Sequence, residues 1–154
     1  MANAERAVHV PPGEGPTIQG PAGGPLTFKV RGEATGGRVT AFENVVAPGE
    51  GPPLHRHANE DESWYVIDGR LRFRLGDEEY EAATGSYVYV PRGVPHAFVN
   101  SGDAPARILV SFTPSGIEAF FDRFAQLPDG PVDPAAFREL GAPVGMEVLG
   151  PPLR

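Results

Sequence analysis

The stretch "GEGPPLHRHANEDESWYVIDG", Gly49–Gly69, places two of the chain's four histidines one residue apart, just before an acidic cluster. In a β-strand, residues i and i+2 point to the same face, so His55 and His57 project into one space, roughly 6 to 7 Å apart along the strand. This separation lets two imidazoles reach the same metal ion.

A carboxylate follows the two histidines within the length of a tight turn. Three acidic residues, Glu60, Asp61 and Glu62, follow His57, and Glu62 is the first residue of the strand-like run "ESWYVIDG". Alternation along that run puts Glu62 on the same face as Trp64 and Val66, which belong in a core. We therefore expect Glu62 to face the histidines, and Glu60 and Asp61 to face solvent.

A third histidine lies in "GSYVYVPRGVPHAFVN", residues 85–100. The turn "PRGVP" leads into His96, and Phe98 and Asn100 share its strand face. A lone histidine is more often structural than a ligand, but three with one carboxylate suit a divalent ion of Fe, Mn, Co, Ni, Cu or Zn. His9, in a Pro-rich segment, is expected to be exposed and unliganded. We predict one metal ion per chain, with the ligands His55, His57, Glu62 and His96.

Composition excludes several classes of partner and site. A chain of 154 residues with 40% hydrophobic content is the size of one domain, and its net charge of -7 would repel nucleic acid and anionic membrane surfaces. The absence of cysteine excludes disulfides, thiolate metal sites and a cysteine nucleophile. No stretch has the character of a signal peptide or a membrane span, so we expect a cytoplasmic protein.

The pattern of short apolar runs indicates an all-β, antiparallel fold. The 20 glycines and 18 prolines are spread along the chain and break it into short pieces. In "RLRFRL", residues 70–75, arginines alternate with apolar residues, which predicts one wet and one buried face. "DG" at 68–69 and "GDE" at 76–78 are typical of hairpin turns. The expected strand segments are 26–32, 37–47, 63–77, 78–83, 86–91, 96–100 and 106–114.

Helical spacing occurs only near the end of the chain. The apolar stripe of "PSGIEAFFDRFAQLPDG", residues 114–130, is predicted to pack on the outside of the sheet. A membrane-surface helix is the alternative, but its polar face carries Glu118, Asp122 and Arg123 rather than a basic cluster. Asp133 is placed as an N-cap before a last short helix. The stripe consists of Ile117, Phe120, Phe121, Phe124 and Leu127.

The two histidine stretches together resemble the two cupin motifs. Residues 49, 55, 57, 62 and 69 reproduce the spacing of the first motif, and residues 85, 91, 93, 96 and 100 that of the second, with 15 residues between them. The resemblance covers residues 26–113 and is closest to small, single-domain quercetin 2,3-dioxygenase-like cupins. It implies a jelly-roll barrel, a double-stranded β-helix, with the metal at its mouth. We expect an extended Pro/Gly-rich arm at 1–25, for which disorder is the alternative, the barrel at 26–114 and a helical segment packed on it at 115–154.

The resemblance also implies a function. A metal-dependent dioxygenase of the quercetinase type, acting on an aromatic or polyhydroxylated molecule with dioxygen, is the leading interpretation, with Glu62 as catalytic base. A non-redox isomerase, cyclase or lyase is the second, since the same metal can act as a Lewis acid. A small-molecule binding or sensing protein without turnover is the third.

Several aromatic residues are candidates for a substrate pocket, although core filling is the usual role of such side chains. The predicted pocket residues are Trp64, Phe73, Phe98 and Phe112. Asn100 shares the face of His96, with hydrogen bonding to a turn as its alternative role. We expect a homodimer, because pairing would cover exposed sheet edges.

Overall fold

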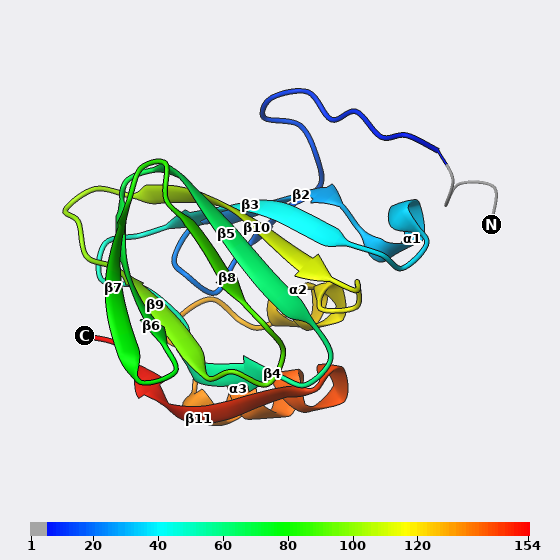
Figure 1. The fold of residues 1–154 in the computed structure, drawn as a ribbon. Coiled ribbons are helices and arrows are strands. Elements are labelled where there is room, and N and C mark those ends of the chain that lie inside the picture. The colour runs from blue at the N-terminus through cyan, green and yellow to red at the C-terminus, as the bar shows by residue number, and fades with distance from the viewer. Residues whose placement is uncertain (1–5) are drawn as a thin grey trace.

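The structure, a computed structural model, describes residues 6–154. Two antiparallel β-sheets face one another and make up most of the molecule (Figure 1). In spatial order, the six-stranded sheet contains β1 (Thr17–Gln19), β2 (Pro25–Val30), β3 (Thr40–Val46), β10 (Ala106–Thr113), β5 (Asp61–Asp68) and β8 (Tyr87–Val90). The five-stranded sheet contains β11 (Met146–Pro152), β4 (Pro53–His57), β9 (His96–Asn100), β6 (Arg70–Leu75) and β7 (Glu78–Ala83).

The chain passes repeatedly from one sheet to the other, as in a jelly roll. β3 and β5 lie in the six-stranded sheet, whereas β4, between them in sequence, lies in the five-stranded sheet. The two sheets form a sandwich and do not close into one barrel. The prediction of an all-β, antiparallel jelly roll with short C-terminal helices is confirmed.

One of the two predicted hairpins is wrong. Gly76, at φ 61°, turns β6 back onto β7, and these strands pair along their length as predicted. The "DG" turn instead joins β5 to β6, which lie in different sheets and do not pair. Gly69 has φ 114°, and a Cβ there would lie 2.7 Å from the Cβ of Ala106. Glycine is therefore needed for a crossing between the sheets rather than for a hairpin.

Alternating side chains of the two sheets fill the space between them. Every second residue of β3 is buried, and β6 buries Leu71 and Phe73 while its arginines are more exposed. This is the alternation that period-two patterning predicts. The largest fully buried side chains are Trp64, Phe28, Phe42, Phe73, Leu26, Leu71, Ile108 and Ile117.

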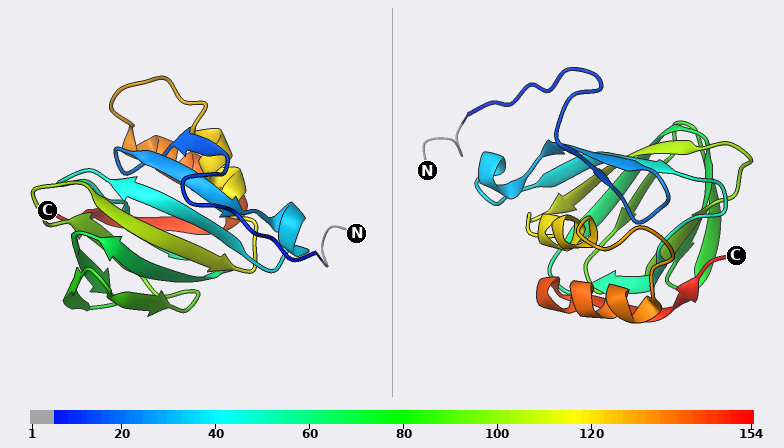
Figure 2. Two further views of the ribbon diagram at one scale, coloured as in Figure 1. Left: turned by 90° about the horizontal axis from the view of Figure 1, so that it is seen from above. Right: turned by 180° about the vertical axis from the view of Figure 1, so that it is seen from behind.

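The helices are α1 (Gly32–Thr35), α2 (Glu118–Phe124), α3 (Pro134–Gly141) and a 3₁₀ turn at Ala142–Val144. Helices α2 and α3 lie together at one side of the sandwich, and α1 lies apart from them, directly after β2 (Figure 2). Asp133 caps α3 as predicted, accepting a hydrogen bond from the Ala135 amide at 2.9 Å. No helix among residues 6–154 combines the length and apolar character needed to cross a membrane.

The apolar stripe of α2 does not pack on the outer face of a sheet, contrary to the prediction. The rings of Phe121 and Phe42 lie 5.0 Å apart, and Phe42 belongs to the inward face of β3. Period-3.6 spacing identifies the buried face of a helix but not the surface that covers it. Here the stripe covers the inner side of the sandwich, and so it reaches the site described below.

Polar contacts hold α2 against the strands. The Glu118 carboxylate is buried and accepts three hydrogen bonds, from the Gly32 amide at 2.7 Å, the Thr40 hydroxyl at 2.9 Å and the Gly116 amide at 2.6 Å. Asp122 accepts two hydrogen bonds from the Arg31 guanidinium, at 2.9 and 2.5 Å. Charge-assisted bonds of this kind are stronger than neutral ones, so α2 has a defined position.

Both ends of the chain contain strands that were not predicted. The predicted arm spans residues 1–25, of which 1–5 lie outside the described residues, and its residues 17–19 form β1, paired with β2. The predicted C-terminal helical segment ends in β11, which pairs with β4 beside His55 and His57. The many prolines and glycines of both segments interrupt the alternation of apolar and polar residues, so neither strand was recognised from the sequence. The edge position of β1 and β11 accommodates such residues.

Candidate metal centre

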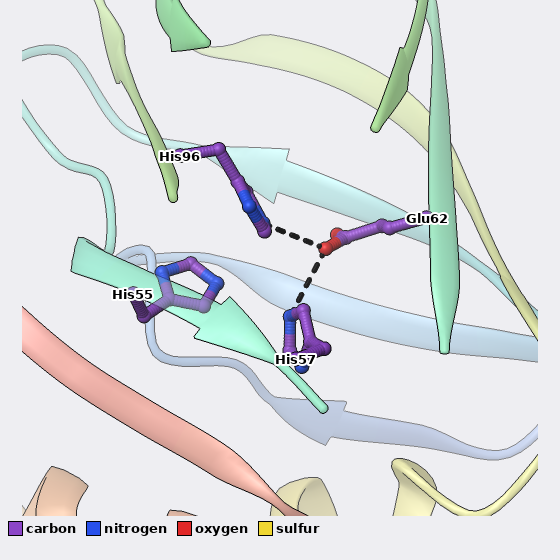
Figure 3. Close-up of side chains that lie close together, drawn as sticks. All are labelled: His55, His57, Glu62 and His96. Carbon is purple, nitrogen blue, oxygen red and sulfur yellow. Dashed lines mark hydrogen bonds and ion pairs between the residues drawn. The ribbon is translucent and has the colours of Figure 1, made fainter. Parts of the chain in front are cut away.

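The four predicted ligands meet between the two sheets (Figure 3). His55 and His57 come from β4, His96 from β9 and Glu62 from β5. His55 is paired in register with His96, and Glu62 with Phe112 of β10. In addition, the Gly93 amide of the "PRGVP" turn donates to the His57 carbonyl at 2.8 Å, which ties the second histidine stretch to the first.

The side chains converge on the Glu62 carboxylate. Its Oε1 lies 3.1 Å from Nε2 of His57 and 3.1 Å from Nε2 of His96. One potential ligand atom of each of the four side chains lies within 4.8 Å of all the others, and all four residues are buried. The rings of His55 and His96 are 4.4 Å apart.

Backbone carbonyls orient two of the imidazoles. Nδ1 of His55 lies 2.7 Å from the Pro53 carbonyl, and Nδ1 of His96 lies 2.9 Å from the Val94 carbonyl. A carbonyl oxygen only accepts, so each Nδ1 carries a proton. Nε2 of the neutral His55 ring therefore has a free lone pair, whereas Nε2 of His96 bonds to the Glu62 carboxylate. This arrangement prepares a histidine to bind a metal ion through Nε2.

Glu60 does not face solvent, contrary to the prediction. It is 3% exposed, and its Oε2 lies 3.9 Å from Nδ1 of His57. Both atoms are buried without a hydrogen-bond partner among the described residues. The Glu60 carboxylate therefore faces Nδ1 of His57, the position that the Pro53 carbonyl has at His55 and the Val94 carbonyl has at His96. Alternation along a strand gave no signal for this contact, because Glu60 lies in the turn between β4 and β5. Asp61, the other residue predicted to face solvent, is partly exposed, and its carboxylate accepts a hydrogen bond from the Arg92 amide at 2.9 Å.

The electrostatics of the cluster favour cation binding. Burial, together with repulsion from His96 and His57, lowers the pKa of His55 from 6.5 to about 3. Burial acts to raise the pKa of Glu62, but hydrogen bonds from His57 and His96 outweigh it and lower that pKa to about 2. Burial also acts to lower the pKa of His96, and the bond to Glu62 raises it above its ordinary value. At neutral pH Glu62 is ionised and His55 is neutral, which are the metal-binding forms of these groups.

The residues fit a divalent transition metal. Three imidazole nitrogens and one carboxylate oxygen form a donor set that such ions accept while keeping open positions. Two ligands at about 2.1 Å from one ion are at most roughly 4.2 Å apart. The 4.8 Å spread of the four groups therefore requires only a small closing movement.

A small cavity of about 60 Å³ opens beside the metal centre, and three of the proposed ligands, His55, His57 and Glu62, line it. Three of the predicted pocket residues, Trp64, Phe98 and Phe112, line it. Phe73 does not: it is fully buried behind them, 5.2 Å from the Trp64 ring and 5.5 Å from that of Phe98. Alternation along the strand correctly predicted that Phe73 points inward. It could not predict that the rings of Trp64 and Phe98 separate Phe73 from the cavity, because that depends on how the two sheets pack.

Other parts of the lining were not predicted. Phe42 and Asn44 of β3 line the cavity, as do Phe120 and Phe121 of α2. Phe42 and Asn44 both lie at inward-facing positions of the β3 alternation, which could have identified them, whereas Phe120 and Phe121 depend on the placement of α2.

Asn100 does not line the cavity. Its side chain donates to the Val46 and Ala104 carbonyls at 2.9 and 2.8 Å, as in the turn-binding alternative.

Apart from the ring nitrogens of the ligand His57, two buried polar atoms of the lining residues have no hydrogen-bond partner within the described part of the chain. They are Nε1 of Trp64, a donor, and Oδ1 of Asn44, an acceptor. Buried polar groups are normally satisfied by protein, water or ligand. A ligand that carries both hydroxyl and carbonyl oxygens has the complementary groups.

Comparison with known proteins agrees with this geometry. Residues 42–112, which contain all four ligands, match the cupin domain family. The tetracenomycin polyketide synthase protein TcmJ of Streptomyces glaucescens is 35% identical over 53% of this chain and 53% of its own length. Quercetin 2,3-dioxygenase of Bacillus subtilis is 33% identical over 58% of this chain and 26% of its own.

A similar fold occurs among solved structures. The structure of a predicted oxalate decarboxylase from Thermotoga maritima has a TM-score of 0.56 at 20% identity, and the match covers 58% of this chain and 79% of that one. At this identity the likeness concerns the fold alone. The chain spans less than two thirds of the length of the two curated relatives described above.

Proposed function

Because residues 42–112 match the cupin domain family, we propose that this chain is a metal-dependent enzyme acting on a small hydroxylated aromatic molecule, with dioxygen-dependent cleavage of the quercetinase type as its reaction. The observation that carries the proposal is the contrast between the polar metal centre and the rest of the cavity. Apart from Asn44 and the three ligand residues His55, His57 and Glu62, the lining is aromatic and aliphatic.

The lining argues against a strongly anionic substrate. Among residues 6–154, no lysine or arginine borders the cavity, so a phosphate or a second carboxylate would be buried there without a cationic partner. An aromatic ring with a hydroxyl group on one edge suits it better. The edge of the ring that carries the hydroxyl packs against Trp64, Phe98 and Phe112, and the hydroxyl faces the ligands.

Glu62 is the proposed proton acceptor. Its carboxylate is ionised, buried and at the point where the substrate hydroxyl would arrive. When bound, the metal would supply Lewis-acid activation and the redox chemistry of oxygen. His55 and His96 hold their Nε2 atoms in place through the backbone carbonyls, and the aromatic lining excludes water from the reacting edge.

A second candidate function has support from the comparisons. The relative from Streptomyces glaucescens is named as a polyketide synthase protein, and it matches this chain at an identity similar to that of the dioxygenase. A non-redox conversion of a polyketide, such as a cyclisation, would use the same four ligands with the metal as a Lewis acid.

The experiment that separates these functions measures turnover and dioxygen uptake of the metal-loaded protein with quercetin and related hydroxylated aromatic compounds. We expect dioxygen consumption in step with substrate loss, no reaction under nitrogen, and a fall of about 100-fold in turnover for Glu62→Gln. Glu79→Gln, an exposed glutamate on β7, is the matched control and should leave turnover unchanged.

Other results would reassign the protein. Metal-dependent turnover that continues under nitrogen moves it to the non-redox class. Tight binding with no turnover under any condition moves it to the class of binding proteins.

A further inference from the structure

The cavity beside the metal ligands is too small for a whole polycyclic molecule. Its volume is about 60 Å³. An apolar protein cavity of about 150 Å³ is known to take up benzene. Only the reacting edge of a polycyclic aromatic substrate therefore fits beside the ligands, and the remaining rings need a separate surface.

A much larger groove lies directly beside the cavity, with a volume of about 1010 Å³. It lies where the turn between β1 and β2, the connection from α2 to α3, and the end of β11 come together, on the side of the molecule seen in Figure 2, right. Its apolar lining includes Phe124, Leu127, Val132, Phe137 and Val148.

The groove and the cavity share a wall. Pro21, Pro53 and Phe137 line both spaces. Pro53 also accepts the 2.7 Å hydrogen bond from Nδ1 of His55, so the groove wall is one hydrogen bond away from a metal ligand. Phe137 is half-buried and packs its ring 5.7 Å from that of Phe124, at the boundary of the two spaces.

The composition of the groove suits flat aromatic rings. Seven of its lining residues are prolines, and proline loses almost no side-chain entropy when a ligand packs on it. The few charged groups are of both signs, which favours a neutral ligand with polar substituents over a polyanion. They are Glu50, Asp129, Arg138 and Arg154.

We propose that this groove is the outer binding subsite for the distal rings of a polycyclic hydroxylated aromatic substrate, whose reacting edge enters the cavity past Pro21, Pro53 and Phe137. This inference rests on the proposed function and adds the size class of the substrate. The shared wall favours a small molecule over a peptide, because Pro21, Pro53 and Phe137 place the groove next to the cavity at the buried ligands. A second copy of the chain is the other possible occupant, and the experiment includes it as an outcome.

The test compares a large and a small ligand, quercetin and catechol, on the metal-loaded full chain. Binding is followed through the fluorescence of Trp64, the chain's single tryptophan, which lines the cavity. Ala125 is exposed and lines the groove, so Ala125→Arg and Ala125→Glu extend a side chain across it with opposite charges. Ala83→Arg on β7, at the opposite edge of the sheet from β11, is the matched control.

We expect both Ala125 variants to weaken quercetin binding at least 10-fold, to leave catechol binding within 2-fold of wild type, and to retain wild-type metal content. Ala83→Arg should change neither affinity. Unchanged quercetin binding in the Ala125 variants, or equal weakening of both ligands, overturns the groove assignment while the proposed function stands.

Two further outcomes have distinct meanings. Wild-type protein that binds metal but neither compound refutes the proposed function, and with it this inference. Light scattering on the same samples shows whether Ala125→Arg changes the molecular mass. A change in mass without a selective loss of quercetin binding assigns the groove to an interface between copies of the chain and overturns the subsite.

Discussion

Replacement of Glu118 by alanine tests the attachment of α2, the helix that supplies part of the cavity lining. The variant removes one carboxylate that accepts three hydrogen bonds, from Gly32, Thr40 and Gly116. These donors lie at the first residue of α1, on β3 and before α2, so the carboxylate links three separate segments. Glu118 itself does not line the cavity.

The expected loss follows from the burial of the donors. A hydrogen bond to a charged group contributes about 1.5 to 3 kcal/mol. Gly116 is exposed and can bond to water in the variant, whereas Gly32 is partly buried and Thr40 is fully buried. Counting only these two at the lower value, the free energy of unfolding should fall by about 3 kcal/mol. For a chain of this length that corresponds to a drop of about 6 to 12 °C in Tm.

The loss should also depend on pH. Burial acts to raise the pKa of Glu118, but hydrogen bonds from Gly32, Thr40 and Gly116 lower it below the ordinary value of 4.5. A carboxyl whose folded-state pKa is depressed stabilises the protein above its unfolded-state pKa, and the stabilisation is lost as the pH falls through the folded-state value. The difference between wild type and Glu118→Ala should therefore be complete at pH 7 and should shrink below about pH 4.

Urea unfolding at pH 7 and at several values down to pH 3 measures both effects. Glu139→Ala, at an exposed position on α3, is the control and should change the free energy of unfolding by less than 0.5 kcal/mol, the usual limit for surface substitutions. A loss below about 1 kcal/mol for Glu118→Ala, or a loss that persists unchanged at pH 3, would refute the reasoning from the hydrogen bonds.

Three other predictions concern the metal centre and assembly. Glu60→Gln should lower metal affinity about 10-fold in a competition titration, because the Glu60 carboxylate lies 3.9 Å from Nδ1 of His57 and orients that ring, whereas Asp61→Asn should not. An equal effect of the two changes would contradict this role of Glu60. His96→Ala should abolish most metal binding, measured by elemental analysis, and His9→Ala should leave it intact; retention of metal by the former would remove His96 from the ligand set. Light scattering should give a dimer, and a mass near 16.4 kDa at micromolar concentration would contradict it.

Local sequence was enough to identify the candidate ligands. The i, i+2 spacing of His55 and His57 and the parity of Glu62 follow from strand geometry, which is the same in any sheet. The repeated short apolar runs likewise predicted an antiparallel β-fold, because alternation reports which residues are buried. The cap at Asp133 is also local, since its partner amide is two residues away.

Contacts between distant segments were decided only by the tertiary structure. The "DG" turn is compatible with a hairpin or with a crossing between sheets, and the approach of Ala106 to Gly69 selects the crossing. Glu60 becomes buried because the turn between β4 and β5 folds back on His57, which no periodicity records. The stripe of α2 shows which face is buried but not that Phe42 of β3 receives it. The sequence alone thus determined which side chains point inward, since that depends on backbone geometry over a few residues. The partners they meet depend on how the two sheets and the helices pack, and only the folded chain specifies that.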